Sequence, residues 1–361
     1  MKKLFVLAAL ALVALVPVAQ ADMAADIQKL VGDNAINYIH PLTNSIGVTM
    51  NSGWYNSSKS YTLFKMPAGL QIYFGEGISV VDAGLKTYQF AGSVQIDNCF
   101  SDPTQATALK SIVGKSTLDI GPVTAPTAVG KKEPTAYTMR QLVVSNATTL
   151  DTNSTLAIRT AWAAMSSTLN DTVFALPGGL DMDYLPGVPP VVGLNLGLPF
   201  KLQLGLRFLP PIKIPNMGKI GQFGLKAQYE FTQWVPVVNN LPLLHTSAMY
   251  AFNNINLFDI MKLNNWTAMV NASADFKFLL GLGLYGGIGI ESSTMTLDYT
   301  VPEGTPGLSG TKVKLEDEGD NFFKAQVGAR VSLLIFDIFA DATFGETTSY
   351  FVGIGLGFNN L

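Results

Sequence analysis

Glycine alternates with large apolar residues near the C-terminal end of the chain, in the segment Val352-Gly353-Ile354-Gly355-Leu356-Gly357-Phe358. Alternation with a period of two predicts a β-strand whose two faces differ. The same alternation recurs from about residue 190 onward, where Gly, Asn, Ser, Lys, Asp or Arg stand opposite the apolar positions. An apolar outer face with a polar inner face is typical of a transmembrane β-barrel, so the pattern indicates where the protein resides.

The number of alternating segments sets the expected size of the barrel. We count about nine strands after residue 190 and about three before it. Single-chain bacterial barrels carry even strand numbers, so we predict an all-β fold, an antiparallel transmembrane β-barrel of about 12 strands, with 10 or 14 as alternatives. Tight turns are expected near Pro199, Phe278-Leu279 and Leu334-Ile335, and longer connections at 210–219, 254–266 and 300–310.

Two sets of residues fall on the predicted inner face. Interior charges in a soluble barrel would cost several kcal/mol each unless paired, whereas a wet or plugged lumen accommodates them, so they favour a membrane barrel over a soluble β-sandwich. The candidate lumen-lining residues are Lys201, Arg207, Lys226, Glu230, Asp275, Lys277, Lys324, Arg330, Asp337 and Asp341. The glycines expected to face a plug or a ligand are Gly281, Gly283, Gly287, Gly289, Gly353, Gly355 and Gly357.

Glu76 is an exception to this pattern. It falls on the apolar face of the predicted strand that starts at Leu70, where a carboxylate would be costly in lipid. It could mark a bulge in the strand, or a strand end near the membrane boundary.

The chain divides into three predicted parts. Residues 1–21 resemble a secretory signal peptide, with a basic start at Lys2 and Lys3, an apolar run and a small-x-small site at its end. Residues 22–55 carry apolar positions at helical spacing and form either a lead-in outside the barrel or a plug at its mouth. Residues 56–361 form the barrel, interrupted at about 97–188 by a polar insert or long loop rich in Thr, Ala, Ser and Pro.

Composition excludes several functional classes. The net charge of -3 provides no basic face for nucleic acid, and only 14% of the residues are charged. The single cysteine, Cys99, excludes an internal disulfide, and two histidines, His40 and His245, make a His/Cys metal site improbable. We therefore predict no metal site and no cofactor.

Two motifs imitate functional sites. The run Gly281-Leu282-Gly283-Leu284-Tyr285-Gly286 is spelled like a dinucleotide fingerprint, but its alternation continues as a strand where that motif requires a helix. The run from Leu315 to Asn321 is acidic but lacks calcium-loop spacing, so a solvated tip is expected. We find no nucleophile elbow and predict that the chain is not an enzyme, with His245 a polar lumen residue.

Five segments carry a family resemblance: Leu42-Thr43-Asn44-Ser45-Ile46-Gly47, Asn51-Ser52-Gly53-Trp54-Tyr55, Arg207-Phe208-Leu209-Pro210-Pro211-Ile212, Gln233-Trp234-Val235-Pro236 and the Gly-Leu-Gly-Phe close. With these segments the chain resembles Gram-negative outer-membrane β-barrel proteins, and in particular an uncharacterised family of envelope proteins. It covers most of the chain outside 97–188 and implies no specific function. A looser similarity, in architecture alone, is to FadL-type transporters of hydrophobic compounds.

These observations lead to two functional hypotheses. The first is a passive channel or transporter for small or hydrophobic molecules, with a possible small hydrophobic ligand. The alternative is a structural or adhesive barrel whose insert and outer loops bind partners. Both place the exported protein in the outer membrane, in contact with its lipid and with the barrel assembly machinery, and neither involves nucleic acid.

Overall fold

The structure is a computed structural model that describes residues 33–62, 69–99, 103–146, 172–187, 189–214, 218–276, 281–300, 310 and 312–358. The predicted signal peptide, residues 1–21, and the first part of the predicted lead-in lie outside the described residues. None of the described helices is both long enough and apolar enough to cross a membrane.

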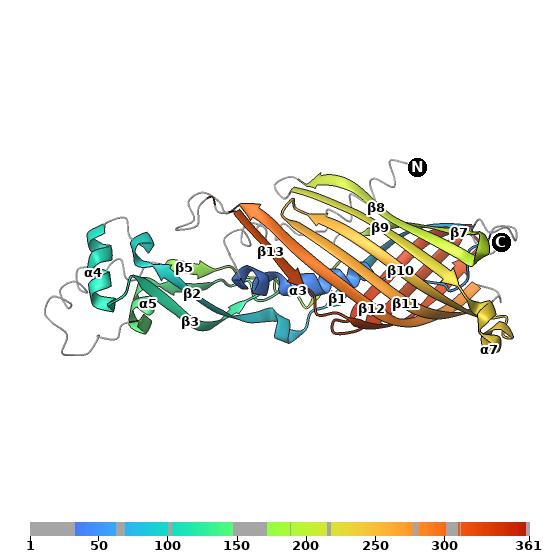
Figure 1. Cartoon of the computed structure of the whole chain (residues 1–361), viewed down its shortest axis with the longest axis horizontal. Coiled ribbons are helices and arrows are strands. Elements are labelled where there is room, and N and C mark those ends of the chain that lie inside the picture. Colours follow the sequence, from blue (N-terminus) through green and yellow to red (C-terminus); the bar gives the residue numbers. More distant parts are fainter. Residues whose placement is uncertain are drawn as a thin grey trace.

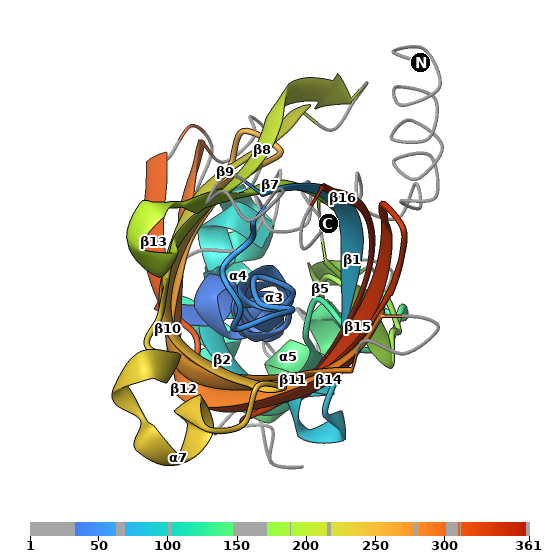
Figure 2. The same cartoon turned by 90° about the vertical axis from the view of Figure 1, so that its right-hand side faces the viewer.

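Most of the described strands belong to one antiparallel sheet that closes on itself (Figure 2). The barrel strands are β1 (Leu70–Val80), β7 (Val191–Leu198), β8 (Leu202–Ile214), β9 (Gly218–Glu230), β10 (Leu244–Leu257), β11 (Met261–Phe276), β12 (Gly281–Thr300), β14 (Phe323–Leu333), β15 (Phe336–Phe344) and β16 (Ser349–Phe358). Their order is β11-β10-β9-β8-β7-β1-β16-β15-β14-β12, and a β11–β12 pairing closes the ring.

Two short strands extend this sheet. β6 (Tyr184–Pro186) pairs with β1, and β13 (Lys312–Glu318) pairs with β12. Among the described residues, the closed ring therefore has 10 strands and the whole sheet has 12. The predicted total of about 12 strands matches the whole sheet, and the predicted alternative of 10 strands matches the closed ring.

The side chains of the ring alternate as the sequence predicts. On β16, Val352 and Ile354 point outward and are more than half exposed, whereas Phe351 and Gly353 point inward and are buried. On β14, Val327 is exposed while Lys324 is fully buried. The barrel thus has an apolar outer surface and a polar interior.

The two ends of the barrel differ. At one end, which we call the turn end, β7 and β8 are joined by Pro199–Lys201 and β14 and β15 by a turn at Leu334. At the other end, the predicted long connections at 210–219 and 254–266 are wrong. β10 and β11 continue to a turn at residues 258–260, and β8 and β9 continue to Ile214 and from Gly218.

The sequence predicts loops in place of these extensions because the polarity of the two strand faces reverses along each strand. Beyond Phe252 the outward residues of β10 become Asn254 and Asn256, while the inward ones become Ile255 and Leu257, both buried. β9, β11 and β12 reverse in the same way. A belt of outward aromatic side chains, which we call the girdle, lies at or next to this reversal: Phe208, Phe223, Phe252, Trp266, Phe323, Phe344 and Tyr350.

A second body, which we call the head, protrudes beyond that end (Figure 1). It is the described part of residues 81–183, and it begins earlier than the predicted insert at 97–188 because the chain leaves the barrel after Val80. Its strands pair only with each other, β2 with β3 and β4 with β5. Its elements are η1 (Ala83–Lys86), β2 (Thr87–Gln95), η2 (Ile96–Cys99), α4 (Pro103–Val113), β3 (Thr117–Pro126), β4 (Thr135–Thr138), α5 (Met139–Asn146) and β5 (Thr172–Leu176).

One helix connects the head to the barrel. α3 (Asp33–Asn51) begins beside the head, enters the barrel and lies inside the ring of strands (Figures 1 and 2). It continues through Pro41, which lacks the N–H that would bond to the carbonyl of Asn37. Two short helices at the turn end, η5 (Thr232–Trp234) and α7 (Pro236–Asn239), connect β9 to β10.

Candidate functional site: the plugged lumen

The lumen is occupied by the N-terminal part of the chain. We call residues 33–62 the plug; it consists of α3 and the segment that runs on toward the turn end. Trp54, Tyr55 and Tyr61 of this segment are almost fully buried. Tyr55 packs edge-on against the ring of Tyr285 from β12, with centroids 5.5 Å apart. The predicted alternative of a lead-in outside the barrel does not describe these residues.

Cations of the wall hold the carboxyl end of α3. Arg207 Nη1 donates to the carbonyl of Met50 at 2.8 Å, and Nη2 donates to the carbonyl of Ser52 at 2.7 Å. Lys324 Nζ donates to the carbonyl of Asn51 at 3.0 Å. The last carbonyls of a helix have no partner within it and carry the negative end of its dipole. The wall therefore supplies the charge that this helix end requires.

The same arrangement continues along the segment after the helix. Lys226 Nζ donates to the carbonyl of Trp54 at 2.9 Å, and Gln228 Nε2 donates to that of Ser57 at 2.7 Å. Two side chains of β9 thus hold a stretch of backbone that has no regular structure. Because a buried carbonyl without a donor is costly, this stretch is specified by the wall as much as by its own sequence.

Within the wall, acidic side chains balance some of these cations. Lys324 Nζ lies 3.0 Å from Glu291 Oε2, and both side chains are buried. Arg330 Nη2 lies 2.9 Å from Asp275 Oδ1. Removing one member of a buried ion pair leaves an uncompensated charge in the interior. These ion pairs therefore favour the side-chain arrangement described here over others.

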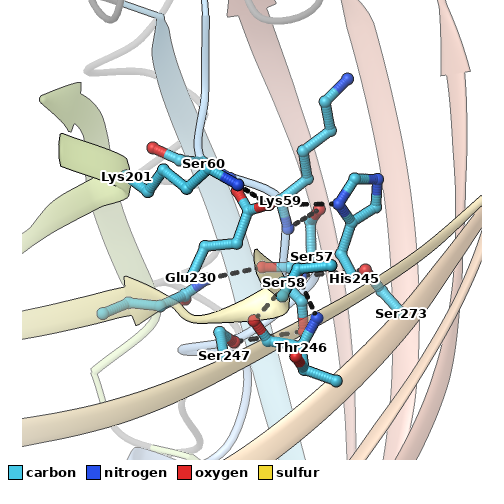
Figure 3. Close-up of polar contacts among 12 residues, drawn as sticks. Ser57, Ser58, Lys59, Ser60, Lys201, Glu230, His245, Thr246, Ser247 and Ser273 are labelled. Carbon is cyan, nitrogen blue, oxygen red and sulfur yellow. Dashed lines mark hydrogen bonds and ion pairs between the residues drawn. The ribbon is translucent and has the colours of Figure 1, made fainter. Parts of the chain in front are cut away.

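At the turn end, the end of the plug is latched by Glu230 (Figure 3). Glu230 Oε2 accepts a bond from the backbone N–H of Ser60 at 2.9 Å. Its Oε1 lies 3.3 Å from both Lys201 Nζ and His245 Nδ1. The carboxylate is nearly buried while Lys201 is exposed, so the latch sits at the mouth of the barrel.

A group of hydroxyls lies just inside this latch (Figure 3). Ser58 Oγ is 2.6 Å from the hydroxyl of Tyr55 and 3.1 Å from Ser247 Oγ. The backbone N–H of Ser58 donates to Ser273 Oγ at 3.0 Å. The group binds the plug to β10 and β11 by short polar contacts.

At the head end, His40 of α3 bridges two carboxylates. Its Nδ1 lies 2.9 Å from Asp317 Oδ1, and its Nε2 lies 2.8 Å from Asp320 Oδ2. A neutral imidazole carries one N–H, so two carboxylate contacts favour the doubly protonated ring. The hydrogen bond to Asp317 is the main cause that raises the pKa of His40 from 6.5 to about 9, with burial opposing it and Asp320 adding to it.

The acidic run around Asp317 is therefore more than a solvated tip. Asp317 is nearly buried and also accepts a bond from Thr43 Oγ1. Asn321, also buried, donates from its side chain to the carbonyl of Asn44 at 3.1 Å. The prediction missed this role because α3 and this run are more than 270 residues apart in the chain.

Most of the predicted lumen-lining residues take part in these contacts. Arg207, Lys226 and Lys324 bind the plug, while Glu230 and Lys201 form the latch. Asp337 is buried and accepts from Gln71, and Asp341 is buried beside the hydroxyl of Tyr285. Arg330 and Asp275 pair with each other, and Lys277 lies outside the described residues. Glu291 was missed, although it continues the inward series of Gly287 and Gly289.

The predicted glycines lie close to neighbouring wall residues rather than to the plug. A Cβ on Gly353 would lie 2.3 Å from the ring of Phe339, and one on Gly355 would lie 3.2 Å from Cβ of Tyr73. On β12, the nearest side chain is Ser332 for Gly281, Asp275 for Gly283, Asn271 for Gly287 and Met269 for Gly289, while Gly357 is buried. The glycines that do meet the plug are others, among them Gly77, Gly187, Gly197 and Gly224.

The comparisons with known proteins identify a family and little else. The sequence profile of the family of unknown function DUF6588 matches residues 1–358. No curated protein matches the chain. Within the described residues, no group of His, Cys, Asp and Glu side chains has the arrangement of a metal site.

Two solved outer-membrane proteins are similar to the chain at low identity. OmpT of Vibrio cholerae is 9% identical over 80% of this chain and 99% of its own, with a TM-score of 0.24. A porin of Rhodopseudomonas blastica is 14% identical over 80% of this chain and 99% of its own, with a TM-score of 0.15. These TM-scores are too low to carry an argument, and the expected FadL-type likeness is not shown.

Proposed function

We propose that this chain, which belongs to the family of unknown function DUF6588, is an outer-membrane β-barrel that serves as a gated passage for small molecules, closed at rest by its own plug. The observation that carries the proposal is the plug itself. It occupies the lumen, yet among the described residues it contributes no strand to the ring, and side chains make its hydrogen bonds to the wall strands. A segment held in this way can move without opening the sheet.

The outer surface supports the membrane location. Side chains such as Ile288, Ile338 and Ile354 are more than half exposed on adjoining parts of the ring, which is costly in water and favourable in lipid. The girdle lies where the outward residues change from apolar to polar, and aromatic rings prefer that boundary in membranes. The reversal in β9 to β12 would then mark the surface of the bilayer.

The polar interior supports a passage for solutes rather than a barrel that stays closed permanently. Arg207, Lys226, Lys324 and Glu291 line the wall around the plug, and such side chains would face water once the plug shifts. A lumen intended to remain closed permanently could be filled with apolar side chains at a lower cost of desolvation. Small polar solutes are therefore the first class to test, with a small hydrophobic ligand as the other member of the proposal.

The test compares an open and a locked variant in planar lipid bilayers. Deleting residues 33–62 should raise the conductance well above that of the full chain. For the lock, Ser52→Cys with Ser349→Cys in a Cys99→Ser background places a disulfide where two hydroxyl oxygens lie 2.8 Å apart. Oxidation should abolish openings of the full chain and a reductant should restore them, with Ser52→Cys alone as the control.

Two results would contradict the gated passage. The first is an unchanged conductance after deletion, in protein shown to be folded by its heat-modifiable migration on gels. The second is an oxidised double-cysteine variant that conducts as well as the reduced one. Because the lock retains every residue of the plug, it tests gating even if the deletion variant does not assemble.

The head favours a second candidate function, the display of a binding surface. Its apolar side chains Leu109, Leu118, Ile120 and Leu142 are buried in a cluster that it shares with α3 and the barrel, and it protrudes beyond the end of the barrel opposite Pro199 and Leu334. The head is carried by the longest connection of the ring, between β1 and β7, and longer connections face outward in outer-membrane barrels, so the head would face outward. Removing residues 82–183 should then abolish adhesion of cells to a surface while leaving heat-modifiable migration intact, and unchanged adhesion would contradict it.

A further inference from the structure

The wall of the barrel contains a break beside β7. β7 begins at Val191, whereas its neighbours continue toward the head end, β1 to Val80 and β8 to Ile214. The last β7–β8 pair is Gly193 with Arg207, so the part of β8 from Phe208 onward pairs with β9 alone among the described residues. We call the region between β6, which pairs with β1 here, and this free edge of β8 the seam. In Figure 2, β8 leans away from the ring at this place.

Prolines line both sides of the seam. Pro210 and Pro211 lie on the free edge of β8, where the register with β9 also shifts. Pro186, Pro189 and Pro190 lie on the opposite side, between β6 and β7. Proline has no N–H to donate to a neighbouring strand, so neither side can add a complete ladder to the other. The prolines in these two segments therefore account for the break in the wall.

The plug lies directly behind the seam. The backbone N–H of Gly187 donates to the carbonyl of Gly77 at 2.7 Å, which ties the broken strand to β1. A Cβ on Gly187 would lie 2.9 Å from Cε of Met50, and one on Gly77 would lie 3.0 Å from Cβ of Thr49. These glycines let the carboxyl end of α3 approach the wall beside the seam. The plug therefore packs against the inner side of the wall at this level.

Glu76 supplies a polar group at the level of this break. It lies on the outward face of β1, between the residues that pair with β7 and those that pair with β6, and opposite Val352 on β16. The register of β1 is continuous, so no bulge turns the side chain inward. Its Oε1 is buried and accepts no hydrogen bond from the described residues. One backbone bond, from the N–H of Gly77, leaves the other oxygen of this outward carboxylate without a partner in the apolar belt.

We propose that the seam is a binding site, open to the membrane, for an amphiphile. This ligand has a long apolar tail and, at its polar end, a cationic group that donates hydrogen bonds. The ammonium group pairs with the Glu76 carboxylate, while the tail lies along the outward apolar side chains beside it, such as Ile78 on β1 and Val352 on β16. An ammonium group satisfies the carboxylate with charge-assisted hydrogen bonds, whereas a fatty-acid carboxylate at this position is repelled. The proposal rests on the membrane location in the proposed function and adds a substrate class and a lateral route to it.

The test measures saturable binding of radiolabelled dodecylamine to the full chain in lipid nanodiscs, against empty nanodiscs. Wild type should bind it, and Glu76→Gln should weaken binding by about tenfold or more, as expected for loss of a charged hydrogen bond. Glu76→Lys should exchange the preference, so that dodecanoate binds in place of dodecylamine. Ile354→Gln, which places an amide on the outward face of β16, should leave binding unchanged and serves as the control.

Three outcomes would overturn the proposal. They are equal binding of dodecylamine by wild type and Glu76→Gln, dodecanoate bound by wild type as tightly as dodecylamine, and no saturable binding to wild type. None of them alters the conductance comparison of deleted and locked plugs, which is made without any amphiphile. Failure of the seam and failure of the gated passage are therefore distinguishable.

Discussion

The guanidinium of Arg207 lies over the ring of Trp54, with Cζ 3.8 Å from the ring centroid. Arg207 comes from the wall and Trp54 from the plug, and both are almost fully buried. The same guanidinium donates to the hydroxyl of Tyr73 at 3.0 Å, so every side of the group has a partner. A buried cation without a carboxylate is stabilised here by carbonyls, a hydroxyl and a π-face together.

Arg207→Lys should loosen the plug although the charge is kept. Lysine is a point charge that can neither stack on Trp54 nor reach two carbonyls and a hydroxyl with a rigid fork. We expect a loss of about 2 kcal/mol in the free energy of unfolding, measured by urea titration in lipid vesicles. Lys219→Arg, an exchange at an exposed position, is the control. Equal stability of Arg207→Lys and wild type would contradict the described geometry.

Stability should depend on pH through His40. The pKa of His40 is raised to about 9 in the folded protein and returns to 6.5 when the chain unfolds. The stabilisation is therefore complete below about pH 6.5 and is lost as the pH rises through 9. The midpoint of thermal unfolding should fall between these pH values in wild type and change less in His40→Gln. A wild-type profile that rises over this range would show that the bridge to Asp317 and Asp320 does not form.

Gly353 should tolerate no side chain while Phe339 is present. The two residues are direct partners in the β15–β16 pairing, and a Cβ on Gly353 would lie 2.3 Å from the phenyl ring. Gly353→Ala should cost about 1–3 kcal/mol of unfolding free energy, as overpacking does, and Phe339→Ala should remove part of that cost in a double-mutant cycle. Gly121→Ala, where a Cβ meets nothing within 4 Å, should be neutral.

Two residues on the outward face of β12 test the position of the membrane. Ile288 lies within the apolar belt, and Thr296 lies on the same face beyond the reversal. Ile288→Arg should destabilise the folded barrel by about 2–4 kcal/mol in lipid, whereas Thr296→Arg should be tolerated. Folding yields into vesicles, scored by heat-modifiable migration, measure the difference. Similar yields for the two variants would argue against a bilayer boundary between them.

The ring of strands was predictable because alternation is a local property of the sequence. Each apolar position of β14 and β16 could be assigned to the outer face from its neighbours alone, and Lys324 and Arg330 to the inner face. The reversal along β10 was equally visible, since Ile255 and Leu257 simply exchange places with Asn254 and Asn256. Because each of these strands carries both polarities, a pattern with one fixed apolar face predicts loops where the strands in fact continue.

The contacts of the plug could not be predicted in this way. Arg207 binds carbonyls of residues more than 150 positions earlier, and backbone carbonyls leave no mark in a sequence. Likewise, the aromatic residues that face the glycines of β16 come from β1 and β15, so pairing partners were required before their roles could be assigned. The alternation along a strand indicates which face a residue occupies. The pairing register between strands is needed to identify the neighbours that the residue contacts on that face.

α3 belongs to two bodies at once. Ala35, Tyr38 and Ile39 are buried in the same apolar cluster as residues of the head, and Met50 near the other end is held by Arg207 and Gln222 of the wall. A helix of 19 residues spans roughly 28 Å at 1.5 Å per residue. Such a rod is stiff along its axis, so a load applied to the head, by shear or by a large attached object, is carried inward as tension on the last turn of the helix. The head, the stiff helix and the plug thereby form one mechanical unit, in which a force on the head acts on the segment that occupies the lumen.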